Sequence, residues 1–114
     1  MRKSEWLRLR HMLEAAEEAV AFAAQRQREE LEINRMLSLA LVKLIEIIGE
    51  AASSIPSTTQ QFYSQIPWQD LIGMRHRLVH GYDEIDLDVV WEVIQQDLPP
   101  LIEELKRIIP SSNP

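Results

Sequence analysis

The sequence has no cysteine among its 114 residues. This absence excludes disulfide bonds, thiolate catalysis and metal sites built from cysteine. Long apolar runs are also missing, because the longest apolar tract, Leu37–Ile48, is interrupted by Lys43 and Glu46. The N-terminal segment Met1–Glu5 lacks the apolar stretch of a secretion signal. We therefore expect a soluble, cytoplasmic protein without membrane association.

Basic residues are in deficit, with 12 Lys and Arg against 18 Asp and Glu and a net charge of −6. This balance argues against broad, non-specific binding to nucleic acid. The charges are unevenly distributed, however, since seven of the basic residues lie at or before Arg35 and eight of the acidic residues lie after Arg77. Between residues 70 and 83 the local balance is basic, owing to Arg75, Arg77 and two histidines. Such a region fits a site for one or two phosphates better than a surface that coats DNA.

The apolar pattern is that of a helical protein. Hydrophobic residues make up 46% of the chain, and they recur at three- and four-residue steps. No strand pattern and no internal repeat is evident. The predicted helices span about Ser4–Arg28, Leu31–Ser53 and Trp68–His80, with a fourth from Asp86 that Pro99 and Pro100 kink or restart. We predict an all-α fold, an up-and-down bundle of four to five helices in one domain over residues 1–110, with a C-terminal tail at 111–114.

Local signals mark several helix ends. Ser4 is a plausible N-cap of the first helix, and Asp86 can cap the fourth. Pro67 stands where a helix begins well. Ile55–Thr59 ends the second helix and opens a polar loop to about Gln65, which we expect to be the most mobile segment.

The stretch Met74–Tyr82 holds two of the three histidines and two arginines. On a helix starting at Trp68, at about 100° per residue, Arg75 projects from the middle of an apolar arc. The arc comprises Trp68, Leu71, Ile72, Met74, Leu78 and Val79, and the opposite polar face comprises Gln69, Asp70, Gly73, His76, Arg77 and His80. Gly73 would leave room there for a close approach.

An arginine does not lose its proton, so burying Arg75 requires a carboxylate partner or a polar interface. Glu46 and Glu50 are the candidate partners, because they share a face of the second predicted helix with Lys43. The alternative is that Lys43 and these carboxylates simply pair with one another at the surface.

The residues with reactive side chains lie close to the predicted end of this helix. Gly81 suits a left-handed position just past the helix end, which would place His80 in the last turn and Tyr82 on the chain that follows. A histidine exchanges protons, an arginine fork suits phosphate and a tyrosine offers a hydroxyl. Together they indicate phosphate-ester chemistry, although each residue taken singly could have a purely structural role, such as a favourable charge at a helix end or packing.

Three chemistries compete for this stretch. His76 and His80 have the spacing of a helical metal pair, but no third ligand is evident, since Asp83 and Asp86 lie past the turn. Hydrolysis by a Ser–His–Asp triad lacks the strained serine turn that would support it. Metal-free RNA cleavage fits better, because the ribose supplies the nucleophile and the protein only an acid or base and a cation, as His80 and Arg75 can.

Arg75, His80 and Tyr82 also form an R-x-x-x-x-H-x-Y motif that resembles the signature of the HEPN superfamily. Within it, the chain is similar to the HepT toxins of the HepT–MntA toxin–antitoxin systems. The resemblance extends over nearly the whole chain, with further landmarks at Ile45–Ala52, Ile66–Trp68 and Asp97–Leu101. His76 departs from the pattern, because the family usually carries another polar residue there, often Asn or Asp.

The resemblance implies a metal-independent endoribonuclease, without a cofactor, that acts as a homodimer with two motifs facing a shared cleft. Its substrate would be RNA, with tRNA as one candidate, and its products a 2′,3′-cyclic phosphate and a 5′-hydroxyl. Arg75 and His80 would be catalytic, with His76 and Arg77 in support. An MntA-like nucleotidyltransferase antitoxin would add AMP to Tyr82 and block the site by bulk and charge.

Two other functions remain open on the sequence alone. The chain could be a non-catalytic helical module that presents Tyr82 or nucleic acid to a nucleotidyltransferase, which its acidic charge favours. It could also be a structural bundle whose core arginine, Arg75, is paired with Glu46 or Glu50.

Overall fold

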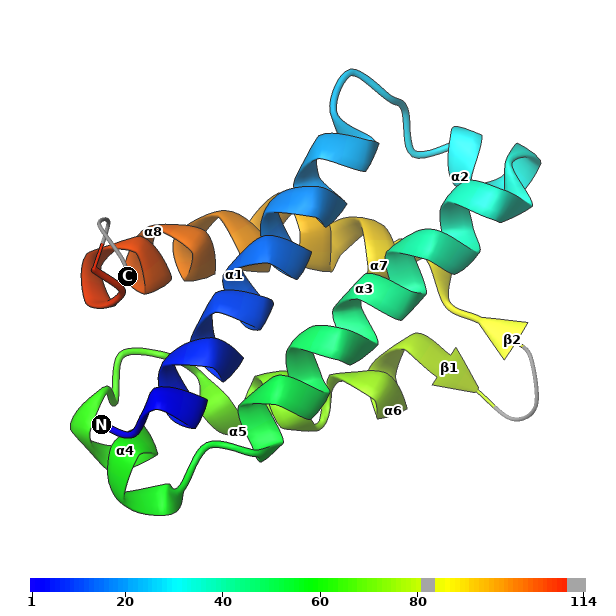
Figure 1. The fold of residues 1–114 in the computed structure, drawn as a ribbon. Coiled ribbons are helices and arrows are strands. Elements are labelled where there is room, and N and C mark those ends of the chain that lie inside the picture. The colour runs from blue at the N-terminus through cyan, green and yellow to red at the C-terminus, as the bar shows by residue number, and fades with distance from the viewer. Residues whose placement is uncertain (81–83, 111–114) are drawn as a thin grey trace.

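The computed structural model describes residues 1–80 and 84–110. The chain folds back and forth in helical arms, and each arm runs opposite to the one before it (Figure 1). The arms are α1 (Lys3–Ala23), α3 (Arg35–Ser53), the pair α5 (Trp68–Ile72) and α6 (Met74–Leu78), and a last arm in which α7 (Leu87–Glu92), a π-helical segment (Val93–Asp97) and α8 (Leu98–Ile108) follow one another. The predicted all-α, up-and-down bundle is confirmed.

The core lies around α3. This helix packs against α1 along much of its length and also contacts α5 and α6, while α1 contacts α8 on its other side. The fully buried side chains recur at three- and four-residue steps, as on any helix with one buried face. Those of α1 are Leu9, Met12, Ala16 and Ala19, those of α3 include Leu41, Ile45, Ile48 and Ala52, and those of the last arm include Val90, Leu98 and Leu105.

The first two predicted helices are shorter than expected. The N-cap of α1 is Arg2, without a side-chain capping bond, so the expectation for Ser4 is wrong. This helix ends at Ala23, shortly before Gln25 adopts a left-handed φ of 61°. The second predicted helix is split into α2 (Glu30–Ile33) and α3, because Asn34 is extended and its side chain accepts a hydrogen bond from the Leu37 amide at 3.0 Å. Asparagine is a strong N-cap, so a new helix starts there.

Other helix boundaries follow from caps and prolines. The segment expected to be a polar loop contains a short helix, α4 (Ser57–Phe62). The predicted cap of α7 is confirmed, because Asp86 accepts a hydrogen bond from the Val89 amide at 3.2 Å. Pro99 and Pro100 lie in the first turn of α8, directly after the π-helical segment. Since proline has no N–H to donate, this pair interrupts the regular α-helical hydrogen bonds there.

The predicted helix from Trp68 to His80 is not continuous. It is interrupted at Gly73 (φ −87°, ψ 3°), and α6 ends at Leu78. Val79–His80 instead forms β1, which pairs antiparallel with β2 (Glu84–Ile85) in the register Val79↔Ile85 and His80↔Glu84. Strands of two residues are too short to show an alternating pattern in the sequence. The predicted helix end at Gly81 and the predicted tail at 111–114 lie outside the described residues.

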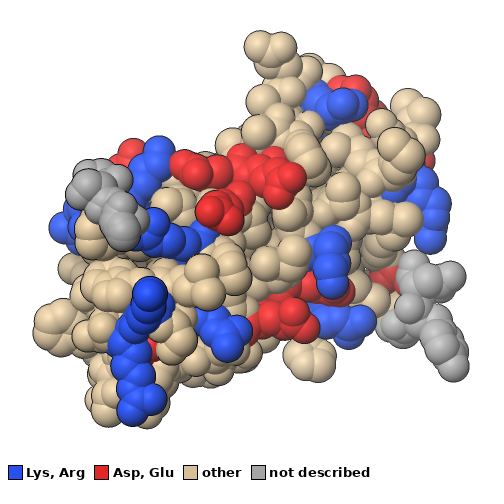
Figure 2. All heavy atoms as spheres, viewed as in Figure 1, with Lys and Arg blue, Asp and Glu red and all other residues tan. Residues whose placement is uncertain are grey.

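The surface carries mixed charge. On the face shown in Figure 2, acidic side chains gather over α1, where Glu14, Glu17 and Glu18 are exposed. Over α3 and α6, acidic and basic side chains alternate on the same face. In the part of the chain that the structure describes, no helix has the length and apolarity needed to cross a bilayer.

Candidate functional site

Arg75 lies on α6 and reaches across to α3. Its Nε donates a hydrogen bond to Oε2 of Glu46 at 3.0 Å, so of the two candidate carboxylates the structure pairs it with Glu46. The Arg75 side chain is 66% exposed and that of Glu46 is 23% exposed. The expectation that Arg75 projects from the middle of the apolar arc is therefore wrong. The buried stripe is narrower than predicted, because Ile72 and Val79 are only half-buried, and Arg75 lies at its edge.

A pocket of about 200 Å³ lies beside this ion pair. Its lining combines apolar side chains with Arg75 and the carboxylates of Glu46 and Glu50, and is made by Ile45, Glu46, Gly49, Glu50, Ser53, Leu71, Ile72 and Arg75. Gly49 makes this junction possible, because a Cβ at that position would lie 2.8 Å from the carbonyl oxygen of Leu71. The close approach that the sequence suggested at Gly73 thus occurs at Gly49, whereas a Cβ on Gly73 meets only the Gln69 oxygen of the preceding turn, at 3.3 Å.

His80 projects from β1 toward the start of α7. Its Nε2 lies 3.4 Å from Oδ2 of Asp86, and its side chain is 56% exposed. The other carboxylate oxygen of Asp86 is held by the Val89 amide. That hydrogen bond is the main cause of the lowered pKa of Asp86, which burial opposes and His80 reinforces. A carboxylate that stays ionised here is an anionic acceptor for the imidazole.

The supporting residues of the motif also lie on α6. His76 and Arg77 are exposed, and Nη2 of Arg77 lies 3.6 Å from Oε1 of Glu92 on α7. Burial raises the pKa of Asp97, in the π-helical segment, and the nearby Arg77 partly offsets this effect. The cationic side of α6 is therefore balanced by acids of the last arm.

The structure tests the geometry of the metal hypothesis. His76 lies in α6 and His80 in β1, so they do not form a pair four residues apart on one helix. Among residues 1–80 and 84–110, no three His, Asp or Glu side chains converge as a metal site would require. Tyr82, the proposed acceptor of AMP, falls outside the described residues.

Sequence reasoning missed one contact of this site. Asp86 was predicted as a helix cap, but not as the partner of His80. The prediction of a helix through residue 80 separated the two residues, while the β1–β2 pairing brings them together. No signal in the sequence could have shown this contact, because strands of two residues are too short for an alternating pattern.

Comparison with known proteins agrees with the resemblance noted in the sequence. The family described as "Ribonuclease HepT-like" matches residues 12–108. A "Putative RNase" of Methanocaldococcus jannaschii is 34% identical over 98 residues, which cover 86% of this chain and 81% of that protein. The "Probable ribonuclease HepT" of Thermococcus cleftensis is 29% identical over 108 residues, which cover 95% of this chain and 98% of that protein.

A longer relative is matched only in part. The "Gamma-glutamylcyclotransferase and putative RNase" of Methanocaldococcus jannaschii is 34% identical over 109 residues, which cover 96% of this chain and 49% of that protein. The chain thus spans about half the length of this relative. No solved structure matches the chain. Because the family match covers most of the sequence and a relative above 30% identity is covered over most of its own length, the chain belongs to the HepT-like ribonuclease family of the HEPN superfamily.

Proposed function

We propose that this protein is a metal-independent endoribonuclease and the toxin of a toxin–antitoxin pair. The observation that carries the proposal is the family match over residues 12–108, which contains an intact Arg75–His80–Tyr82 motif. Two further observations support it. The side chains of Arg75 and His80 are both more than half exposed, at 66% and 56%, and each has a carboxylate neighbour, at 3.0 Å and 3.4 Å. An RNA backbone can therefore reach both groups.

The proposed reaction uses the RNA's own hydroxyl. The ribose 2′-oxygen attacks the adjacent phosphorus, the bond from phosphorus to the 5′-oxygen breaks, and a 2′,3′-cyclic phosphate and a 5′-hydroxyl result. His80 exchanges a proton with the attacking or the leaving oxygen. Arg75 stabilises the negative charge that builds on the phosphorane oxygens.

The ion pair with Glu46 is compatible with this role of Arg75. A guanidinium has five N–H donors, and the bond to Glu46 uses the one on Nε. No hydrogen bond between described residues uses the four donors on the two terminal nitrogens, and their planar arrangement suits the oxygens of a phosphate. Glu46 would thus fix the direction of the Arg75 fork.

The proposal includes two partners. The active form is a homodimer in which two motifs face a shared cleft, and the substrate is RNA, with tRNA as one candidate. An MntA-like nucleotidyltransferase antitoxin neutralises the toxin by adding AMP to Tyr82. The added phosphate brings negative charge and bulk to a site that must admit an anionic backbone, so it would repel and occlude RNA.

A non-catalytic binding module is the second candidate. The net charge of −6 favours it, because an acidic body attracts RNA weakly. In that case the motif would present Tyr82 or bound nucleic acid to the nucleotidyltransferase, and no property of the protein would depend on proton transfer by His80.

Growth arrest in cells separates the two candidates. Expression of the wild-type chain should arrest growth, and His80→Ala and Arg75→Ala should abolish the arrest while the proteins remain folded. His11→Ala, at an exposed histidine of α1, is the matched control and should stay toxic. Growth arrest by a folded His80→Ala variant would contradict the catalytic assignment.

A further inference from the structure

We infer that Asp86 is a positioning residue for His80, with one carboxylate oxygen capping α7 and the other fixing which ring nitrogen of His80 carries the proton. The catalytic meaning of this inference rests on the proposed function, but the contact itself does not. The inference comes from three features: the anchoring of Asp86, the anchoring of α7 and the charge of the Asp86 carboxylate.

Asp86 is anchored on both its backbone and its side chain. Its amide donates to the Leu78 carbonyl oxygen at 2.7 Å. Its Oδ1 accepts a hydrogen bond from the Val89 amide at 3.2 Å. With these two bonds made, Oδ2 is the oxygen that faces Nε2 of His80 at 3.4 Å. That separation is long for a hydrogen bond, as is common for catalytic contacts before substrate binds.

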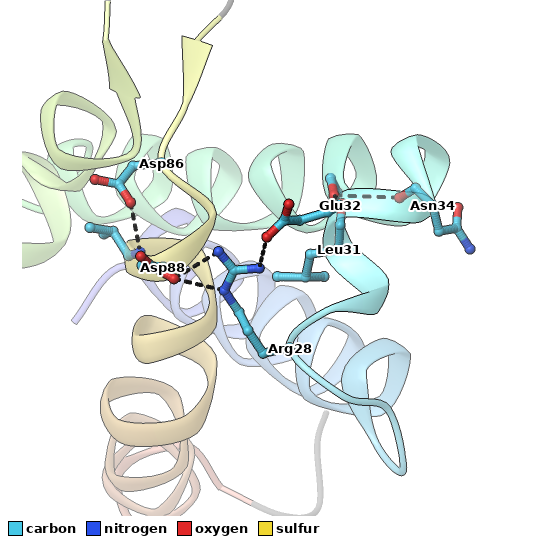
Figure 3. A network of polar contacts seen from close by, with 8 residues as sticks. Arg28, Leu31, Glu32, Asn34, Asp86 and Asp88 are labelled. Atoms are coloured by element: carbon cyan, nitrogen blue, oxygen red, sulfur yellow. Dashed lines mark hydrogen bonds and ion pairs between the residues drawn. The ribbon is translucent and has the colours of Figure 1, made fainter.

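The start of α7 is held in place by an ion pair with Arg28. Arg28, in the connection after α1, donates from Nε to Oδ1 of Asp88 at 2.8 Å. Its Nη2 lies 2.7 Å from the same oxygen, and its Nη1 lies 3.0 Å from Oε2 of Glu32. Figure 3 shows this network next to the Asp86 cap, with Asp88 turned toward Arg28. The two aspartates at the start of α7 therefore have different partners: the Asp88 side chain pairs with Arg28, and the Asp86 side chain contacts His80.

The charge of Asp86 decides the direction of its bond to His80. The hydrogen bond from Val89 holds the pKa of Asp86 below its usual range, so at neutral pH this carboxylate only accepts hydrogen bonds. In the neutral imidazole the proton must then sit on Nε2, and Nδ1 carries the free lone pair. Nδ1 is thus the nitrogen available to take a proton from a ribose hydroxyl.

Other charged groups lie on the neighbouring elements. Glu84 is opposite His80 in the β1–β2 register, Asp88 is in the first turn of α7, and His76 and Arg77 belong to α6. Glu84 is a suitable control position, since it is exposed and opposite His80 in register, but no side-chain hydrogen bond joins these two residues in the described structure.

Two substitutions separate capping from positioning. Asp86→Asn is isosteric and keeps an oxygen for the Val89 amide, so its NH₂ group faces Nε2 of His80 and offers a donor instead of an acceptor. Asp86→Ser keeps a capping hydroxyl but is too short to reach the imidazole. Asn and Ser are good helix caps, as Asp is, so a purely structural role of Asp86 predicts little effect of either variant on the tautomer of His80.

The primary test is the tautomer of His80, measured by long-range ¹⁵N–¹H NMR of the imidazole nitrogens in the neutral state. The exposed His11 serves as an internal reference. In the wild type and in Glu84→Gln, His80 should show a larger share of the Nε2–H form than His11. In Asp86→Asn that share should fall below the wild-type value. An unchanged share in Asp86→Asn would overturn the inference, whatever the protein's activity.

The second readout is RNA cleavage by the same proteins. Asp86→Asn should lose about tenfold to a hundredfold in rate, part of the ~10²–10⁴ that general acid–base catalysis contributes, while Glu84→Gln stays at the wild-type rate. Wild-type cleavage by Asp86→Asn would overturn the inference and leave the proposed function standing. Absence of cleavage by the wild type would contradict the proposed function, while the tautomer measurement would still decide the role of Asp86.

Discussion

Nε of Arg75 lies 3.0 Å from Oε2 of Glu46, and this ion pair joins α6 to the central helix α3. The arginine side chain is 66% exposed, whereas the glutamate is 23% exposed. The less exposed partner is thus the one on the long helix, and it accepts from the guanidinium nitrogen nearest the backbone. Arg75 is not a core arginine, because most of its side chain is exposed and the pairing with Glu46 is made through Nε.

Glu46→Gln should therefore reduce activity more than stability. Glutamine can still accept from Nε, but the charge that attracts the guanidinium is lost. The cleavage rate should fall by about tenfold, less than the ~10²–10³ that follows removal of a charge-stabilising donor itself. The free energy of unfolding should change by less than about 1 kcal/mol, as for other solvent-exposed ion pairs. Rates on RNA and urea unfolding curves measure the two effects.

Glu50→Gln is the matched control for that prediction. Glu50 lines the same pocket, but the hydrogen bond from Arg75 goes to Glu46. Its substitution should leave the cleavage rate at the wild-type value. An equal loss in both variants would mean that the pocket's total negative charge, and not the ion pair, sets the activity of Arg75.

The two glycines flanking this junction should respond differently to alanine. A Cβ at Gly49 would lie 2.8 Å from the Leu71 carbonyl oxygen, on the backbone of another helix. Gly49→Ala should therefore destabilise the fold by about 1–3 kcal/mol, the usual cost of overpacking. Gly73→Ala should change stability less, because its nearest contact is 3.3 Å away and its φ of −87° suits any residue. Thermal melts of both variants test this, and equal losses would argue against the close packing of α3 on α5.

Much of the fold could be predicted because its signals are local. The cap at Asp86 and the interruption before Pro99 follow from the hydrogen-bonding capacity of single residues. The breaks at Asn34 and Gly73 were missed because apolar spacing continues across them, and the spacing alone does not show a change of backbone direction. Asn and Gly both commonly end helices, so the sequence did contain a signal for each break. The continuous apolar spacing favoured unbroken helices more strongly.

The candidate site was predictable only in part. The motif identified Arg75 and His80, and helical spacing offered Glu46 and Glu50 as equal partners for the arginine. Choosing Glu46 requires the position of α6 on α3, which depends on the close contact at Gly49. The pairing of His80 with Asp86 depends on a two-residue strand pair, and no sequence period reveals an element that short.

Two aspartates should give the protein opposite pH responses. The pKa of Asp86 is lowered in the folded state. The stability that this carboxylate contributes is therefore present above its pKa in the unfolded state, near 3.8, and is lost as pH falls through its pKa in the folded state. The pKa of Asp97 is raised in the folded state. The stability that its neutral carboxyl group contributes is therefore fully present below about pH 3.8 and is lost as pH rises through its pKa in the folded state. At pH 7, Asp97→Asn should raise the melting temperature and Asp86→Asn should lower it. Both differences should shrink at pH 3, and differences independent of pH would contradict this assignment.

Tyr82→Phe should leave the protein toxic but prevent its neutralisation by the antitoxin. Phenylalanine lacks the hydroxyl that would accept AMP, but the Arg75 and His80 side chains are retained. The variant should arrest growth even when the nucleotidyltransferase antitoxin is co-expressed, whereas the wild type should be neutralised. Tyr63→Phe, at the other tyrosine of the chain, is the control and should remain sensitive to the antitoxin. Neutralisation of Tyr82→Phe would show that another residue is modified.

The most direct measurement is cleavage of total RNA and tRNA by the purified protein in excess EDTA, with wild type and His80→Ala side by side. Before the assay, mass spectrometry should establish that the wild type carries no AMP. The account predicts cleavage by the wild type alone, with 2′,3′-cyclic phosphate and 5′-hydroxyl ends. No cleavage by the unmodified wild type, or equal cleavage by His80→Ala, would contradict it.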